Sequence, residues 1–184
     1  MMAWIGVTVV TFVAAGAISH FPGGASIGSI DGGIEPWAVG LAFGAVGGLL
    51  IAGAQWFVLR GQLQHAWRWV PLTVVAFAVI HAMRDGLALG TPELPVAVLD
   101  GLLIGAVAWA VLEPRKAAGW TLAATLGWTV GLSAGLALSH AFGLDLSSNY
   151  AQNHMLIGGV TGALFAAATG VAWRWALDRA PART

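Results

Sequence analysis

Three histidines follow apolar runs at nearly regular intervals in this 184-residue chain. His20, His81 and His140 are 61 and 59 residues apart. Neutral imidazole binds transition metals such as zinc and copper, and it can also ligate a haem or a (bacterio)chlorophyll axially. A histidine at a helix end can equally be structural, because it interacts favourably with the last carbonyls of the helix. The three histidines are therefore candidate metal or cofactor ligands, with a structural role and a proton relay as alternatives.

Four aspartates and one glutamine extend the set of candidates. Asp31, Asp85 and Asp145 follow the histidines by 11, 4 and 5 residues, where they could supply carboxylate ligands, orient a ligating imidazole, or lie in a solvated loop. Asp100 lies just inside an apolar run, where an acid is costly and often functional, although the first turn of a helix also favours an acid. Gln55 lies within another apolar run, and we expect it to pair across helices or to contact a substrate.

The sequence contains no pattern typical of an enzyme. A Gly-x-Ser-x-Gly nucleophile motif, a His-Glu-x-x-His zinc motif, a P-loop and a dinucleotide-binding fingerprint are all absent, and there is no cysteine. The segments between the apolar runs are too short for a soluble catalytic domain. We predict that the protein is not an enzyme.

The composition is typical of a protein that is solvated by lipid. Hydrophobic residues make up 58% of the chain and charged residues 9%, with a mean hydropathy of +0.81. The net charge is zero and there is no basic patch, which argues against a nucleic-acid partner. Ten tryptophans against one tyrosine are typical of an interfacial aromatic belt, or of packing against a cofactor such as haem, (bacterio)chlorophyll or carotenoid.

Six apolar runs are long enough to cross a bilayer, which needs about 20 residues. They cover roughly 3–20, 37–59, 69–88, 95–112, 118–142 and 153–177. Six spans place both termini on one side, and that side then receives most of the basic residues, namely Arg60, Arg68, Arg115, Lys116, Arg174, Arg179 and Arg183. The opposite side receives only Arg84. The positive-inside rule therefore predicts a multi-pass protein of the bacterial inner membrane with both termini in the cytoplasm.

The runs also show an internal repeat. Ser19-His20 at the end of the first run corresponds to Ser139-His140 at the end of the fifth. The even runs carry small residues at spacing four, which permit close helix packing: Gly40, Gly44 and Gly48, then Gly101 and Gly105, then Gly158 and Gly162. We therefore predict an all-α membrane fold of three helical hairpins, roughly 1–60, 67–113 and 118–178. Three like units favour pseudo-threefold packing, which would bring the three histidines to one depth.

One segment resembles a known group of proteins. GAQWFVLRGQLQHAWRW, Gly53 to Trp69, is similar to a segment of uncharacterised bacterial polytopic membrane proteins in which a Gly-rich helix ends in Gln-Trp-x-x-Leu-Arg. Gly61 departs from that pattern, because such proteins often have a second basic residue there. The resemblance implies a six-helix bacterial membrane protein and no particular activity.

Three functions are compatible with these features. The first is a structural or accessory subunit of a larger membrane complex, such as an electron-transport or photosynthetic assembly, in contact with lipid and with other membrane subunits. The second is a membrane protein that binds a metal, haem or pigment through His20, His81 and His140. The third is a small transporter or channel, for which Gln55 and Asp100 are the only intramembrane polar candidates.

Overall fold

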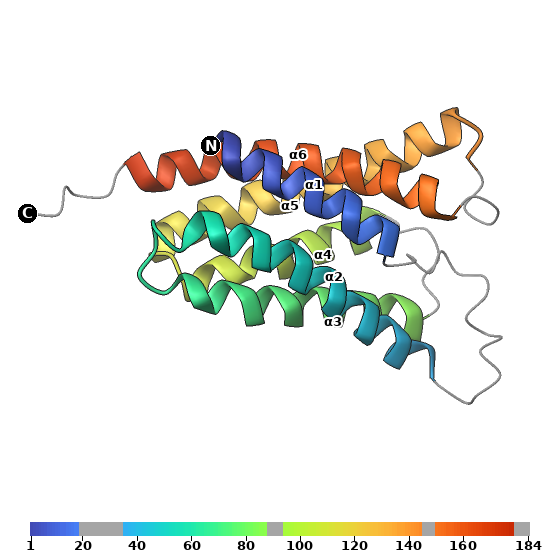
Figure 1. The fold of residues 1–184 in the computed structure, drawn as a ribbon, viewed down its shortest axis with the longest axis horizontal. Coiled ribbons are helices and arrows are strands. Elements are labelled where there is room, and N and C mark those ends of the chain that lie inside the picture. Colours follow the sequence, from blue (N-terminus) through green and yellow to red (C-terminus); the bar gives the residue numbers. More distant parts are fainter. Residues whose placement is uncertain (19–34, 88–93, 145–149, 179–184) are drawn as a thin grey trace, which may run out of the picture.

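The computed structural model describes residues 1–18, 35–87, 94–144 and 150–178, which form a bundle of α-helices (Figure 1). The long elements are α1 (Met2–Ile18), α2 (Pro36–Leu59), α3 (Trp69–Gly86), α4 (Leu94–Ala106), α5 (Pro114–Ala141) and α6 (Tyr150–Asp178). Two 3₁₀ turns adjoin them, η2 (Ala66–Arg68) before α3 and η3 (Val107–Ala110) after α4. Each of the six apolar runs of the sequence thus coincides with one helix.

Four of these helices are long and apolar enough to cross a membrane. They are Pro36–Leu59, Ala66–Gly86, Pro114–Ala141 and Gln152–Trp175. The first and fourth helices are apolar but shorter, at Met2–Ala17 and Leu94–Ala110. The helices expose large apolar side chains to their surroundings, as expected where lipid and not water covers the bundle.

Local chemistry explains where several helices begin and end. Pro36 and Pro114 each occupy the first turn of a helix and follow an extended glutamate, which suits proline because its missing N–H would have no helical partner. Helix α5 ends at Ala141, and Gly143, two residues later, has a φ of 63° in the left-handed region. There the Gly143 N–H donates to the His140 carbonyl and the Leu144 N–H to the Ser139 carbonyl, both at 3.0 Å. This pair of bonds is a Schellman motif, so His140 lies in the last turn of α5.

Most of the basic residues lie at one end of the bundle. In Figure 1 the start of α1, the end of α6 and the α2–α3 and α4–α5 connections all lie together on the left. Arg60, Arg68, Arg115, Lys116 and Arg174 belong to these segments. We call this the basic end, and the opposite end, where α3 and α5 finish and α4 and α6 begin, the far end.

Close helix contacts follow the glycine-containing faces. Helix α2 packs along α3, α4 along α5, and α6 along both α5 and α1, whereas α3 and α4 touch little. Gly40, Gly44 and Gly48 face α3, Gly101 and Gly105 face α5, and Gly158 and Gly162 face α1. A Cβ atom at Gly101 would lie 2.7 Å from the Thr125 Cα, and one at Gly105 would lie 2.8 Å from the Thr121 Cα. A side chain at these positions would therefore force the helices apart.

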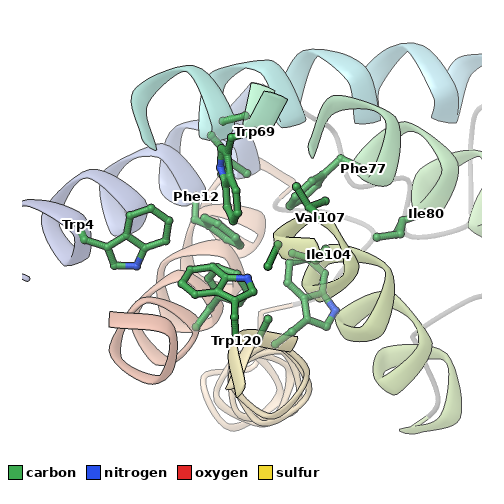
Figure 2. Packing of buried hydrophobic residues seen from close by; sticks show 14 of the residues in the cluster. Trp4, Phe12, Trp69, Phe77, Ile80, Ile104, Val107 and Trp120 are labelled. Atoms are coloured by element: carbon green, nitrogen blue, oxygen red, sulfur yellow. The ribbon is translucent and has the colours of Figure 1, made fainter. Parts of the chain in front are cut away.

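Aromatic rings fill the centre of the bundle, and Figure 2 labels five of them. Their contacts divide them into two layers. The layer nearer the basic end consists of Trp4, Trp69, Trp120 and Trp173, whose ring centroids all lie between 4.7 and 6.1 Å from one another. The next layer consists of Phe12, Phe77, Trp128 and Phe165. Each layer takes one residue from α1, α3, α5 and α6, so the same four helices are held in register at both levels.

Candidate functional site

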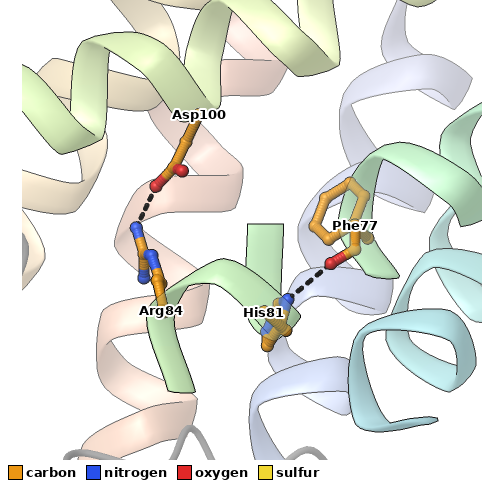
Figure 3. Close-up of polar contacts among 4 residues, drawn as sticks. All are labelled: Phe77, His81, Arg84 and Asp100. Atoms are coloured by element: carbon orange, nitrogen blue, oxygen red, sulfur yellow. Dashed lines mark hydrogen bonds and ion pairs between the residues drawn. The ribbon is translucent and has the colours of Figure 1, made fainter. Parts of the chain in front are cut away.

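A buried ion pair joins α3 to α4 in the half of the bundle nearer the far end. The Arg84 guanidinium donates to the Asp100 carboxylate, and both residues are almost fully buried, with 8% and 4% of their surfaces exposed (Figure 3). Asp100 is the seventh residue of α4, so the prediction of an acid in the first helical turn is wrong. The pair crosses the interface where α3 and α4 otherwise touch little. An ion pair away from water holds its two helices together, because separating the charges would leave each one unpaired.

His81 lies one helical turn before Arg84 and is also buried. Its Nδ1 is 2.9 Å from the Phe77 carbonyl oxygen, and Figure 3 shows the imidazole pointing away from the ion pair. The ring lines a cavity of about 20 Å³ together with Trp128 and Thr161. This volume is enough for about one water molecule. A haem or chlorophyll macrocycle does not fit there.

A second polar contact joins α5 to α6 in the same half of the molecule. The Ser139 hydroxyl donates to Asn153 Oδ1 at 2.5 Å, and both residues are buried, as is the neighbouring His154. Helix α6 begins at Tyr150, so Asn153 lies inside the helix and connects it to α5.

Gln55 is a bridge between three helices. Its amide nitrogen donates to Thr8 Oγ1 on α1 at 3.1 Å, and its amide oxygen accepts from Trp69 Nε1 on α3 at 2.9 Å. The side chain is 1% exposed. Gln55 therefore has the cross-helix pairing that is expected of an amide in lipid, and its oxygen and nitrogen are both engaged.

The predicted histidine set does not share one environment. His81 is buried whereas His140 is exposed, and His20 lies outside the described residues. Trp69 on α3 contacts Trp120 on α5, so residues at the same level of these two helices differ by 51 in number. His81 and His140 differ by 59. His140 therefore lies about two turns, or about 12 Å, farther along the bundle than His81, and these two do not reach the common depth that we expected.

The described residues contain no group of three histidine or acidic side chains that could hold a metal ion. Asp85 lies close to Gly40, at the interface of α2 and α3. Asp31 and Asp145 lie outside the described residues. A metal or pigment site that includes His20 stays a prediction.

Two side-chain contacts, Arg84–Asp100 and Ser139–Asn153, were not predicted from the sequence. From the sequence we placed Arg84 on the side of the membrane opposite the termini, and Ser139 served only to define the internal repeat. One signal could have revealed the ion pair: Arg84 is the only arginine or lysine of the run 69–88, and Asp100 is the only acid of the next run, 95–112. A buried charge in a helix needs an opposite charge within reach, which the adjoining run supplies.

No family model, no curated protein and no solved structure matches this chain.

Proposed function

We propose that the chain is a structural subunit of a membrane assembly, a rigid helix bundle that presents its outer surface to other membrane proteins and to lipid. The observation that carries this proposal is the closed centre of the bundle, where the two aromatic layers lie between the buried polar contacts and the basic end. With its centre filled by rings, the bundle has its outer surface available for function.

The alternative of a transporter or channel is less well supported. Gln55 and Asp100 were its only candidate pathway residues. Gln55 bonds Thr8 and Trp69, and Asp100 pairs with Arg84, so both side chains connect helices to one another. A pathway would also have to pass through the tryptophan layer, whose rings contact one another in all six pairings.

We extend the proposal to the architecture: six spans, in three hairpin units that pack with pseudo-threefold symmetry. In support, the even helices each lie against the odd helix of the next unit, and the last closes on the first. A Cβ atom at Gly44 would overlap the carbonyl oxygen of Phe77, and one at Gly158 would lie 2.6 Å from the carbonyl oxygen of Phe12. Phe77 and Phe12 both belong to the second aromatic layer.

The fourth helix follows the same geometry. A Cβ atom at Gly48 would lie 3.0 Å from the Val74 Cα, and one at Gly101 would lie 2.7 Å from the Thr125 Cα. Val74 precedes Phe77 by three residues, just as Thr125 precedes Trp128 in the same aromatic layer. The three even helices thus meet their partners at one level, which is what pseudo-threefold units require.

For orientation, we propose that the basic end faces the cytoplasm of a bacterial inner membrane. Because the chain has no cysteine, single cysteines can be introduced and labelled from either side. We expect Gly61→Cys and Glu113→Cys to react from the cytoplasmic side, and Glu35→Cys and Leu144→Cys from the other side. Labelling of Glu35→Cys and Gly61→Cys from the same side would contradict the proposed spans.

Photocrosslinking around the outside of the bundle tests the subunit function. A photoreactive residue is placed in native membranes at one exposed apolar position of each helix: Val10, Val46, Val75, Leu102, Leu126 and Val171. We expect one helix face to give a discrete protein adduct, while the buried position Trp128 serves as the control and gives none to a partner. Lipid adducts alone at all six positions would contradict the proposal.

A further inference from the structure

A pocket of about 340 Å³ opens at the basic end between α1, α2 and α6. The last turn of α2 contributes Val58 and Leu59, and the last turns of α6 contribute Gly170 and Arg174. Gln62 lines the pocket from the turn after α2. A lining of this kind, largely apolar with an arginine and an amide, suits a molecule that has an anionic head and an apolar body.

The buried side of the pocket is rigid. Trp4 and Trp173 line it and belong to the tryptophan layer, where their ring centroids are 5.7 Å apart. Trp4 is also held by its indole N–H, which donates to Thr169 Oγ1 at 3.1 Å. A preformed wall costs a ligand little reorganisation on binding.

Gly170 keeps the pocket open. A Cβ atom built there would make ordinary contacts of 3.6 Å with Ile5 and Trp4, so the helices leave room for a side chain that the chain does not have. The glycines of the helix-packing faces differ, because a Cβ atom at Gly158 would lie 2.6 Å from backbone. Gly170 therefore does not serve close helix approach.

The charge around the pocket favours an anion. Arg60, Arg68, Arg115 and Arg174 are all exposed on segments of the basic end. The acids on these described segments are Glu113 and Asp178, against five basic residues, and Lys116 lies 3.7 Å from Glu113. An excess of arginine beside a membrane attracts anionic lipid headgroups.

We propose that this pocket binds the phosphate headgroup and upper acyl region of an anionic phospholipid. Arg174 pairs with the phosphate, because a guanidinium donates two parallel hydrogen bonds to phosphate oxygens. The acyl region lies over Val58, Leu59 and the two tryptophans. The site goes beyond the proposed subunit function and does not depend on it.

Native mass spectrometry of the full-length chain, delipidated in detergent and titrated with phosphatidylglycerol or phosphatidylcholine, tests the proposal. We expect one phosphatidylglycerol to be retained in preference to phosphatidylcholine. Arg174→Gln should weaken this binding roughly tenfold, the loss expected for one charge-assisted contact. Gly170→Leu should weaken it further by filling the pocket.

Two matched variants separate the pocket from general effects. Arg115→Gln removes another exposed arginine of the same end, and Gly53→Leu adds the same bulk at a helical glycine that has nothing within 4 Å. Both should bind like the unmodified chain. Equal retention of the two lipids, or equal losses for Arg174→Gln and Arg115→Gln, would overturn the proposal. Displacement of the lipid by inorganic phosphate at equal concentration would overturn the lipid assignment in favour of a free phosphate ligand.

Discussion

The two halves of the bundle interior are held together by different forces. Toward the basic end the centre consists of aromatic rings. Trp120 contacts Trp4 and Trp69 edge to face and Trp173 at a tilt. Toward the far end the contacts between helices include the Arg84–Asp100 ion pair and the Ser139–Asn153 hydrogen bond. Helix packing in the first half depends on the fit and buried area of the rings. In the second half it depends on pairing opposite charges and on matching hydrogen-bond donors with acceptors.

This difference reflects how the helices are spaced. Four helices converge closely enough for their rings to fill the centre at two levels. Helices α3 and α4 make few other contacts, and there a long arginine reaches across to an acid. Long polar side chains can span a gap that apolar side chains would leave empty, provided that both partners are present.

The largest effect is expected from breaking the aromatic half. Trp120→Ala removes a buried ring that contacts the three other tryptophans, and it should lower the free energy of unfolding by about 4 kcal/mol. Reversible unfolding in mixed detergent micelles measures the loss. Trp67→Ala, at a tryptophan that is 61% exposed, should change the same quantity by less than about 0.5 kcal/mol. Equal losses in the two variants would refute the view that ring packing holds this half.

The second largest loss of stability is expected from breaking the ion pair in the polar half. Arg84→Leu leaves the Asp100 carboxylate buried without its partner and should cost about 3 kcal/mol in the same unfolding assay. The double variant Arg84→Leu/Asp100→Leu should recover most of that loss, because no charge then remains unpaired. If the double variant is as unstable as the single one, charge pairing is not what joins α3 to α4.

A smaller effect is expected where the two halves adjoin. Gly44→Ala introduces a Cβ atom that would overlap the Phe77 carbonyl, so α2 and α3 must separate at a cost of about 2 kcal/mol. Gly53→Ala on the same helix meets nothing within 4 Å and should stabilise the chain by about 0.5 kcal/mol. The free energy of unfolding should therefore fall for Gly44→Ala and rise for Gly53→Ala. Changes of the same sign would contradict this account of close packing at Gly44.

The smallest effect is expected at Gln55, a polar contact within the aromatic half. Gln55→Leu removes its bonds to Thr8 and Trp69 and should cost about 1 kcal/mol, because interhelical hydrogen bonds in membranes are individually weak. The control Gln64→Leu, at an exposed position, should be neutral within about 0.5 kcal/mol. A loss at Gln55 as large as that at Arg84 would show that polar contacts dominate both halves.

Part of the site could be predicted from the sequence and part could not. Gln55 was expected to pair across helices, because an amide in lipid needs a partner, but its partners Thr8 and Trp69 lie 47 and 14 residues away. Asp100 was recognised as a costly acid, while its pairing with Arg84 depends on how the ends of α3 and α4 face each other. The equivalence of His81 and His140 was inferred from sequence spacing, whereas the register of α3 and α5 is decided by which of their rings contact one another.

The sequence by itself determined the helices and their apolar character, because lipid requires continuous hydrogen-bonded helices and the apolar runs end at proline, glycine and polar clusters. It also determined which positions are small enough for close packing, such as Gly44 and Gly158. Only the tertiary structure decided which helix lies against each of those positions, which tryptophans meet in one layer, and that Asp100 pairs with Arg84. The physical reason is that composition and period act along one helix, whereas register and charge pairing are properties of two helices at once.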